Sequence, residues 1–404
     1  MTDTIIIGGG AAGLCLAVIL KQQTPDCSVK VLEAQNRVGK KLATTGNGRC
    51  NISNKKLEIK NYHGDRELAY KLIEGFDFSK QADFFRSIGV IFSDVGDDRV
   101  YPMSLQAASV TDALRFAAME QGVEIITDFK VSSIKRENGM FLVNGDPNLL
   151  AKTVVVACGG KAGGKLGSSD GYNLLKSLGH KIVPLFPSIA QLKTDVTFIK
   201  RLRGIKLEAT VTLTSSMGSR TESGELLFCE YGISGPPVLQ VSRFANGNEP
   251  FVLLDLVPMF DETEITNEIK SRRKLFPKRS VEELFTGFIN KKVGQAVLLW
   301  VGVPATGLCG ELSDRQISDT VKLLKNLKLK VISTTGFENA QVTAGGADTS
   351  QFFCNLMSKK AKGLFAVGEV LNIDGDCGGY NLAFAWASAY AAAKGIADYL
   401  NNKE

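Results

Sequence analysis

One pattern near the start of the chain restricts the fold more than any other. Residues 4–7 read TIII, and a glycine-rich turn follows them directly. The apolar stretch after the turn predicts a helix over 11–21, and SVKVLE at 28–33 predicts a second strand. A strand, a glycine turn, a helix and another strand within about 30 residues form a βαβ unit. The pattern therefore predicts a doubly wound α/β sheet.

The glycines of this turn have the spacing G-x-G-x-x-G at Gly8, Gly10 and Gly13. Gly8 permits the tight turn, Gly10 lets the backbone approach a pyrophosphate, and Gly13 lets helix and strand pack closely. The helix N-terminus would present free N–H groups to the phosphates. Glu33 ends the second strand, where an acid can accept hydrogen bonds from both ribose hydroxyls. We predict a dinucleotide site, and an acid rather than Arg here disfavours a 2′-phosphate.

The chain of 404 residues is long enough for about two or three domains. After about residue 188 its character changes to short strand-like segments separated by turn residues, then to charged amphipathic helices. The apolar α/β character returns near 335. We predict a nucleotide-binding domain over 1–188 and 335–404, interrupted by a β-rich domain at 189–258 and a helical subdomain at 259–334.

The overall composition is that of a globular protein, with a mild net charge of +6 that favours anionic ligands but no nucleic-acid partner. The basic cluster over 272–279 is interpreted as a solvated face, with RNA docking as the alternative. The eight cysteines contain no C-x-x-C pair, so no metal site is expected. The sequence shows neither a signal peptide nor an apolar run of about 18 residues, so we expect a cytoplasmic protein without a membrane partner.

The loop after the second predicted strand separates FAD from NAD as the dinucleotide. Residues 36–51 read NRVGKKLATTGNGRCN, where a plain NAD dehydrogenase would begin a helix. At this loop the chain resembles flavoproteins of the glutathione-reductase type, and TGNGRCN resembles the hallmark of the HI0933-like family, which is related to fumarate-reductase-type flavoproteins. TVVVACGG at 153–160, VTAGGADTSQF at 342–352 and GLFAVGEVLNIDGDCGGYNLAFAWASA at 363–389 fit the same family in order.

This resemblance implies an α/β fold with a Rossmann-like FAD-binding domain of the glutathione-reductase type, interrupted by an inserted β-barrel-like plus helical domain. It implies FAD as the cofactor, and NAD(P)H only as a transient electron donor, because no second G-x-G-x-x-G unit is visible. The residues expected to contact FAD are Gly8, Gly10, Ala11, Ala12, Gly13, Glu33, Ala34, Lys41, Asn47, Gly48, Arg49, Cys50, Asn51, Val131, Cys158, Gly159, Gly160, Gly368, Glu369, Gly378, Gly379, Tyr380 and Asn381.

The C-terminal motif carries its own physical argument. The predicted helix over 379–399 would point its first N–H groups at the N1/O2 edge of the flavin. That edge gains negative charge on reduction, so a helix N-terminus stabilises the reduced form. Glu369 is expected to bind the ribityl chain or a water on the pyrophosphate.

The catalytic residues are less well determined by the sequence. Three candidates could orient a substrate or serve as an acid near the ring, or could simply hold the flavin, and they are Arg49, Asn51 and Tyr380. Cys50 has no partner cysteine, which favours a packing or flavin-contact role. The only two histidines, His63 and His180, are expected to have structural or surface roles.

The expected reaction is hydride transfer through flavin N5 to or from a small organic substrate. The resemblance implies two subtypes: reductases of conjugated ketones such as 3-dehydro bile acids, supplied by NAD(P)H, and oxidases of small amino ketones that use oxygen. Two alternatives stay open, an FAD-binding redox or RNA-associated protein without a metabolic substrate, and an NAD-only dehydrogenase. The sequence determines neither the substrate nor the oligomeric state.

Overall fold

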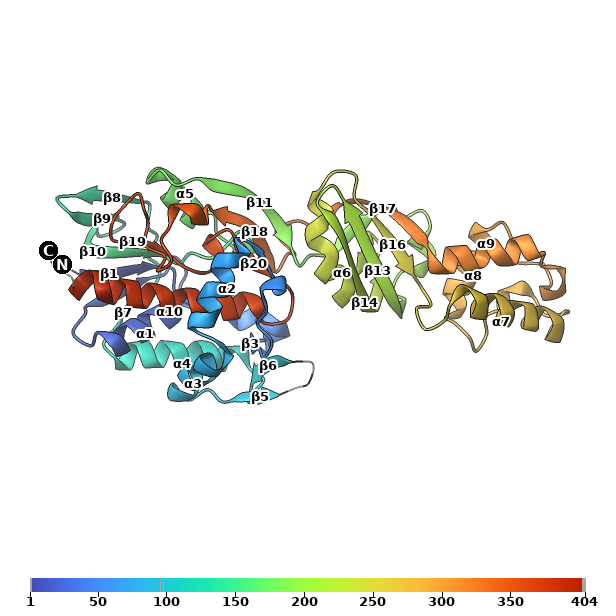
Figure 1. Cartoon of the computed structure of the whole chain (residues 1–404), viewed down its shortest axis with the longest axis horizontal. Coiled ribbons are helices and arrows are strands. Elements are labelled where there is room, and N and C mark those ends of the chain that lie inside the picture. Colours follow the sequence, from blue (N-terminus) through green and yellow to red (C-terminus); the bar gives the residue numbers. More distant parts are fainter. Residues whose placement is uncertain (1, 95, 97, 402–404) are drawn as a thin grey trace. The chain divides into compact units, whose positions relative to one another are not determined.

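The computed structural model describes residues 2–94, 96 and 98–401, and Figure 1 shows the chain coloured along its sequence. The chain divides into two compact units, each with its own hydrophobic core. Unit 1 comprises the residues up to 186 and from 341 onward, and unit 2 comprises 187–340. Unit 1 is therefore assembled from both ends of the sequence.

A seven-stranded sheet forms the centre of unit 1, in the order β7-β2-β1-β10-β9-β8 with β19 also paired to β10. Five strands run parallel, and β8 and β9 extend the sheet in antiparallel fashion. Their bounds are β1 Thr2–Ile7, β2 Val29–Leu32, β7 Glu124–Ile126, β8 Ser133–Glu137, β9 Met140–Asn144, β10 Leu149–Val156 and β19 Leu364–Ala366. Buried apolar runs such as TIII and TVVV suit parallel strands covered on both faces. The predicted Rossmann-like fold is confirmed.

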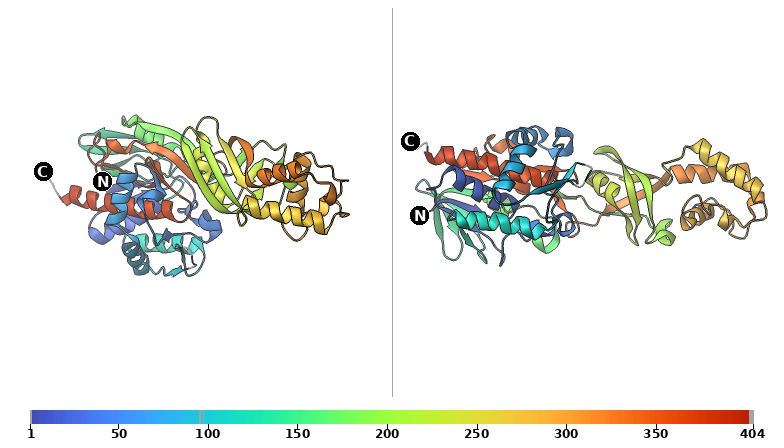
Figure 2. Two further views of the ribbon diagram at one scale, coloured as in Figure 1. Left: turned by 45° about the vertical axis from the view of Figure 1, so that its right-hand side comes forward. Right: turned by 90° about the horizontal axis from the view of Figure 1, so that it is seen from below.

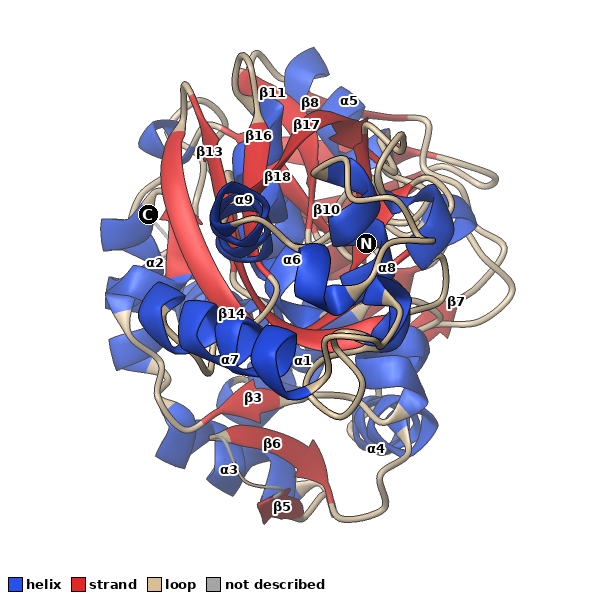
Figure 3. Ribbon diagram, turned by 90° about the vertical axis from the view of Figure 1, so that its right-hand side faces the viewer, coloured by secondary structure: helices blue, strands red, loops and turns tan. Residues whose placement is uncertain are grey.

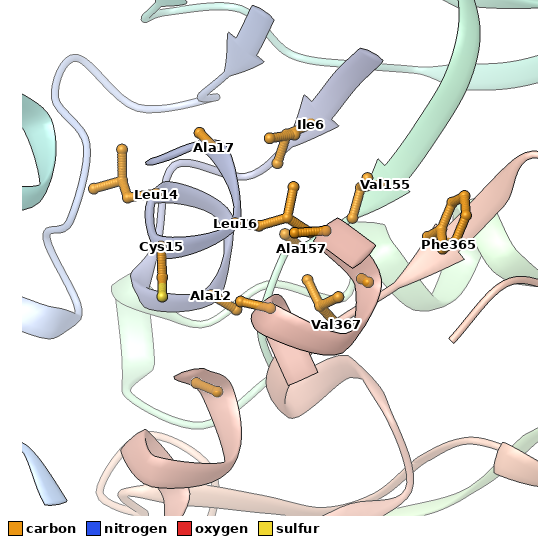
Figure 4. Packing of buried hydrophobic residues seen from close by; sticks show 14 of the residues in the cluster. Ile6, Ala12, Leu14, Cys15, Leu16, Ala17, Val155, Ala157, Phe365 and Val367 are labelled. Carbon is orange, nitrogen blue, oxygen red and sulfur yellow. The ribbon is translucent and has the colours of Figure 1, made fainter. Parts of the chain in front are cut away.

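Three helices of unit 1 lie beside this sheet, namely α1 (Ala11–Gln23), α4 (Ala107–Glu120) and α10 (Tyr380–Asn401), and α1 packs against both of the others. Figure 2 shows the red α10 as the longest of them. The side chains of α1 are buried without a break from Ala12 to Leu20, because the helix has neighbours on every side. In Figure 4, Ile6 of β1 and Val155 of β10 lie around Leu16 of α1. Among the described residues, no helix is both long and apolar enough to cross a bilayer.

Short strands and helices bring distant parts of unit 1 together. Strand β4 pairs with β20, β11 pairs with β18, and β3, β6 and β5 form a three-stranded sheet. The bounds are β3 Ser53–Asn54, β4 Tyr62–Gly64, β5 Phe92–Asp94, β6 Arg99–Pro102, β11 Ile182–Ser188, β18 Val342–Ala347, β20 Ile373–Gly375, α2 Arg66–Gly75, α3 Phe78–Ser87 and α5 Asp170–Ser177. The β4–β20 pairing places residues 62–64 beside residues 373–375, and the β11–β18 pairing joins the end of the first segment of unit 1 to the start of its second.

A closed antiparallel barrel forms one part of unit 2, in the order β12-β15-β14-β13-β16-β17. The bounds are β12 Leu192–Thr194, β13 Lys206–Ser215, β14 Gly218–Phe228, β15 Gly232–Ser234, β16 Phe251–Asp255 and β17 Leu327–Thr334. Figure 3 shows β13 and β14 as long strands. On β13, Ala209, Val211 and Leu213 are buried and alternate with partly exposed threonines, as expected when every second side chain fills a barrel.

The helices of unit 2 share one core with the barrel. They are α6 Pro236–Val241, α7 Glu262–Leu275, α8 Lys291–Trp300 and α9 Asp314–Lys325. Strand β17 lies inside the range 259–334, which the sequence analysis assigned to helices. Its alternation LKLKVIST buries Leu327, Leu329 and Val331, and a strand with this period-2 pattern closes the barrel against β12 and β16.

The basic cluster of unit 2 is not a plain solvated face. Arg272 donates hydrogen bonds to the carbonyls of Leu284 (3.0 Å) and Thr286 (2.7 Å). Arg273 donates to the carbonyl of Leu312 (2.8 Å) and pairs with Asp314 (2.9 Å). Two of the arginines therefore fasten α7 to the segments that follow it.

His180 is an internal anchor of unit 1. Its Nδ1 lies 3.1 Å from the carbonyl oxygen of Leu175, and its Nε2 lies 2.8 Å from the hydroxyl of Ser358. The ring also stacks on Phe352. Burial lowers the pKa of His180, because the charged ring loses its hydration. The expected structural role fits these contacts.

We expect the stability of unit 1 to fall as the pH falls through about 6.5, where the unfolded chain protonates His180 and the folded chain resists it. The urea midpoint can be followed through Trp386, which is buried in unit 1, in a Trp300→Phe background. When the pH is lowered from about 7.5 to about 5.5, the urea midpoint of the protein that retains His180 should fall more than the midpoint of the His180→Gln variant. Equal pH dependence of the two proteins would contradict the assignment.

Candidate functional site

The turn between β1 and α1 contains glycines of two kinds. Packing requires a glycine at Gly8 and Gly13, but not at Gly10. A Cβ at Gly8 would lie 2.5 Å from the carbonyl oxygen of Ala157, and a Cβ at Gly13 would lie 2.0 Å from that of Gly8. A Cβ at Gly10 would meet no atom within 4 Å, and its φ of −85° suits any residue. The backbone at Gly10 is thus open, as approach by a pyrophosphate requires.

The first turn of α1 is suited to an anion. Gly10 caps the helix without a side-chain hydrogen bond, and the first turn contains no acidic residue. The first N–H groups of a helix have no partner inside it and carry the positive end of the helix dipole. The residues present therefore fit the phosphates of a dinucleotide.

Glu33 is held next to this turn. Its Oε2 accepts a hydrogen bond from the Gly9 N–H and its Oε1 accepts one from the Gln35 N–H, both at 2.9 Å. A carboxylate has about four acceptor positions, so two remain for ribose hydroxyls. Binding of the ribose by Glu33 stays a prediction that this geometry permits.

The backbone of the loop over 46–51 adopts left-handed φ angles at four of its residues. Gly46 (φ 57°), Asn47 (φ 54°) and Gly48 (φ 80°) follow one another there, and Cys50 (φ 59°) returns to it. Non-glycine residues adopt this conformation at a cost in free energy, and such residues concentrate at functional sites. The Cys50 side chain is fully buried, and burial raises the pKa of its thiol to about 12. This supports packing rather than nucleophilic chemistry for Cys50.

Asn51 links this loop to the start of α10. With its amide oriented to satisfy both ends, the nitrogen donates to the carbonyls of Ser53 (3.1 Å) and Val100 (3.2 Å). The amide oxygen accepts from the Gly379 N–H at 3.1 Å. A Cβ at Gly379 would lie 2.3 Å from the Ser53 carbonyl oxygen, so only glycine fits there. All three contacts of the Asn51 amide are to backbone, which fits a holding role better than the predicted catalytic one.

The other candidates near α10 differ in their surroundings. Asn381 accepts from the Gly375 N–H and donates to the Gly375 carbonyl, both at 2.8 Å, so its amide fastens the preceding loop. The Tyr380 ring lies edge-on to Tyr62 with centroids 6.0 Å apart. Arg49 is exposed, and its guanidinium lies 5.3 Å from the centre of the Tyr101 ring. Catalytic roles for Arg49 and Tyr380 stay predictions.

One carboxylate connects four segments of the site. The Oε2 of Glu369 accepts from Lys41 at 2.7 Å, and its Oε1 accepts from the Thr343 N–H at 2.8 Å. The Thr343 hydroxyl accepts from the Ala162 N–H at 2.9 Å. A Cβ at Gly160 would lie 2.5 Å from both Glu369 Oε1 and the Thr343 hydroxyl. Glu369 is therefore committed to the chain itself through both of its oxygens.

The predicted FAD contacts differ in exposure. Four are exposed, and they are Ala34, Asn47, Gly48 and Arg49. Seven are buried, and they are Ala12, Gly13, Cys50, Val131, Gly160, Gly368 and Gly378. The others are partly exposed, and they are Gly8, Gly10, Ala11, Glu33, Lys41, Asn51, Cys158, Gly159, Glu369, Gly379, Tyr380 and Asn381. The buried side chains of Ala12, Cys50 and Val131 belong to the core of unit 1.

Several further residues build the site, and no sequence pattern predicts them. Asn54 donates to the carbonyl of Gly378 at 2.9 Å, and the Trp386 indole donates to the carbonyl of Ile52 at 2.8 Å. Thr343 lies within the motif VTAGGADTSQF, but no pattern in the neighbouring sequence indicates its hydrogen bonds with Ala162 and Glu369. His63, for which a structural or surface role was expected, forms a hydrogen bond of 2.8 Å with Asp376. These contacts join residues more than 300 positions apart in three of the cases, so no local pattern reveals them.

Comparisons with known proteins show which family the chain belongs to. The family model described as HI0933-like protein Rossmann domain matches residues 2–395. A 3-dehydro-bile acid delta(4,6)-reductase of Clostridium scindens is 35% identical over 97% of this chain and 98% of its own. A ribosomal RNA dihydrouridine synthase of Haemophilus influenzae is 29% identical over 98% of each chain.

A solved structure shares the fold across nearly the whole chain. It is the 3-ketosteroid-delta4-(5alpha)-dehydrogenase from Rhodococcus jostii RHA1 in complex with 4-androstene-3,17-dione. The match covers 98% of this chain and 96% of that one, with a TM-score of 0.51 and 13% sequence identity. At this identity the likeness concerns the fold alone.

Two alanine substitutions in the glycine turn should separate ligand binding from folding. Gly10→Ala places its methyl group in open space, so we expect the free energy of unfolding to change by about 1 kcal/mol or less, whereas the dissociation constant for FAD should rise about tenfold or more. Gly13→Ala collides with the Gly8 carbonyl and should cost about 3 kcal/mol of stability or more. Urea unfolding of the apoprotein and FAD titration measure both. Unchanged FAD affinity in Gly10→Ala would place the phosphates elsewhere.

A double-mutant cycle should test the contact between Lys41 and Glu369. Losing one charge-assisted hydrogen bond costs about 1.5–3 kcal/mol, so Lys41→Met and Glu369→Gln should each weaken FAD binding by about tenfold or more. The double variant should lose clearly less than the sum of both, since the two changes remove one interaction. Lys40→Met, which removes the neighbouring lysine, is the matched control and should leave the affinity nearly unchanged. Additive losses would contradict the coupling.

Proposed function

The chain belongs to the HI0933-like family and is a flavin-dependent oxidoreductase, and on this premise we propose that it reduces a carbon–carbon double bond conjugated to the ketone of a steroid-like substrate. The observation that carries the proposal is the 35% identity to a bile acid reductase across 97% of the chain. Similarity at this level extends over both units, so it includes residues beyond the nucleotide-binding domain.

The residues of unit 1 fit FAD as the cofactor. The first turn of α1 would hold the pyrophosphate and Glu33 the adenosine ribose. When bound, the flavin supplies a pair of electrons as hydride. We propose NAD(P)H as the donor of these electrons, bound transiently, because the chain contains a single G-x-G-x-x-G unit followed by an acid.

Reduction of a conjugated ketone makes two demands on the protein. The ketone oxygen gains negative charge as the double bond accepts hydride, and a hydrogen-bond donor or cation must stabilise that charge. The neighbouring carbon then needs a proton from an acid held close to it. We propose that Arg49, whose guanidinium is exposed and placed against Tyr101, binds the substrate oxygen or a carboxylate. The start of α10 would favour the reduced flavin through its dipole.

A second candidate is reduction of uridine in ribosomal RNA. Relatives named ribosomal RNA dihydrouridine synthase, from Haemophilus influenzae and Escherichia coli, are 29% and 26% identical over 98% of this chain. Dihydrouridine forms when the uracil C5–C6 double bond, conjugated to the C4 carbonyl, is reduced, so both candidates belong to one reaction class. The internal contacts of Arg272 and Arg273 reduce the basic surface available to RNA. This observation and the lower identity favour the steroid-like ketone.

We expect the purified protein to show the visible absorption of a bound flavin, which NADH or NADPH bleaches without oxygen. A 3-oxo bile acid with a conjugated double bond should then restore the absorption and gain two hydrogens, as seen by mass spectrometry. Restoration by unmodified ribosomal RNA alone would select the second candidate. Restoration by oxygen alone, with release of peroxide, would make the protein an oxidase. Absence of flavin, even after reconstitution with FAD, would overturn the proposal.

A further inference from the structure

A histidine and a carboxylate form a pair close to the start of α10. His63 lies on β4 and stands opposite Asp374 of β20 in the strand register. Its Nε2 lies 2.8 Å from Oδ1 of Asp376, and the two side chains expose 18% and 5% of their surfaces. The pair is mostly removed from water, where its charge state has strong effects on its surroundings.

The carboxylate of this pair is held in place on several sides. The Asp376 N–H donates to the carbonyl of Asn61 at 2.9 Å, and the Asn61 amide lies 3.5 Å from the second carboxylate oxygen. The Asp376 carbonyl accepts from the Asn381 amide at 3.3 Å. Within the part of the chain that the structure describes, the Nδ1 of His63 has no hydrogen-bond partner. The ring therefore has one nitrogen engaged by the carboxylate and one able to take a proton.

The pair belongs to the same cluster of loops as the flavin site. Asp376 stands two residues before Gly378, whose carbonyl accepts from Asn54, and three before Gly379, whose N–H is bound by Asn51. The helix that begins next is the one whose N-terminus favours a reduced flavin. A change of charge at His63 thus occurs beside the segment expected to meet the flavin.

Several other titratable or charged groups surround His63. Burial holds the pKa of Tyr62 and of Cys377 above their usual ranges, so both stay protonated. Asp65 follows β4 and accepts hydrogen bonds from the Leu68 N–H and the Thr349 hydroxyl. Lys60 pairs with Glu58 at 2.5 Å. Asp374 stands opposite His63 on β20 and is buried. The positive charge of Arg99 acts on Cys377, the neighbour of Asp376 in the chain.

We infer that His63 and Asp376 take up one proton when the bound flavin is reduced and hold it for the substrate. This inference rests on the proposed function. Reduction adds negative charge beside a pair that carries one negative charge when His63 is neutral, and protonation of His63 brings the pair to zero. By linkage, each event favours the other.

The proton count balances over one turnover. When bound, the flavin would supply the hydride that adds to one carbon of the double bond, with its two electrons coming from the nicotinamide donor. His63 would receive one proton from solvent and would give it to the neighbouring carbon, so that the substrate gains two hydrogens in all. The pair then returns to its starting state with one negative charge.

The test measures the midpoint potential of the bound flavin between about pH 7 and about pH 8, without substrate. Each proton taken up with two electrons contributes about 30 mV per pH unit. We expect about 59 mV per pH unit for the wild-type protein and about 30 mV in His63→Gln and Asp376→Asn. His180→Gln, which removes the other histidine, is the matched control and should keep the steep slope.

A second readout counts protons directly. An indicator dye should report two protons per flavin on photoreduction of the wild-type protein and one for His63→Gln. Both measurements use FAD-loaded protein at saturating FAD, so weakened binding in a variant does not affect them. Equal slopes and equal proton counts in wild type and His63→Gln would overturn the inference and leave the proposed reaction standing. A protein without flavin would overturn both.

Discussion

The site of unit 1 depends on the carboxylate of Glu369. Hydrogen bonds from Lys41 and the Thr343 N–H engage its two oxygens, and close packing at Gly160 leaves no space around it. Its four segments lie in the loop after β2, the loop after β10, strand β18 and the turn after β19. Ion pairs that are partly buried contribute only when their geometry is good and their remaining oxygens are satisfied, and both conditions hold here. This one group therefore fixes the relative positions of four segments of the site, whereas Asn51 and Asn54 fix the loop at the start of α10.

Glycines make these close contacts possible, and they do so for two different reasons. At Gly8, Gly13 and Gly379 a side chain would collide with a carbonyl oxygen of the chain itself. At Gly10 no such neighbour exists, so packing does not require a glycine there. Contact of its open backbone with the phosphates of a dinucleotide stays a prediction.

Local patterns predicted much of the fold and part of the site. The βαβ unit, the turn glycines and Glu33 lie within 33 consecutive residues, so their arrangement follows from strand and helix periodicity. Strand β17 was assigned to a helical region because charged residues on both sides hid its alternation, and only barrel closure reveals its role. The contacts of Asn51 and His63 were not predicted for a related reason: their partners Gly379 and Asp376 lie over 300 residues away. Interactions of that kind are products of the tertiary fold, and a single sequence does not display them.

The connection between β12 and β17 has a consequence for how such a chain can change. The two strands pair directly, and next to them the Thr335 N–H donates to the carbonyl of Gln191 at 2.9 Å. The polypeptide thus enters and leaves unit 2 at neighbouring points, and the barrel closes on itself without help from the rest of the chain. Insertions with adjacent ends can be exchanged or remodelled while the host domain keeps its fold. Unit 2 can accordingly be replaced as one piece, and the cost to the nucleotide-binding scaffold is limited to a single pair of neighbouring chain crossings.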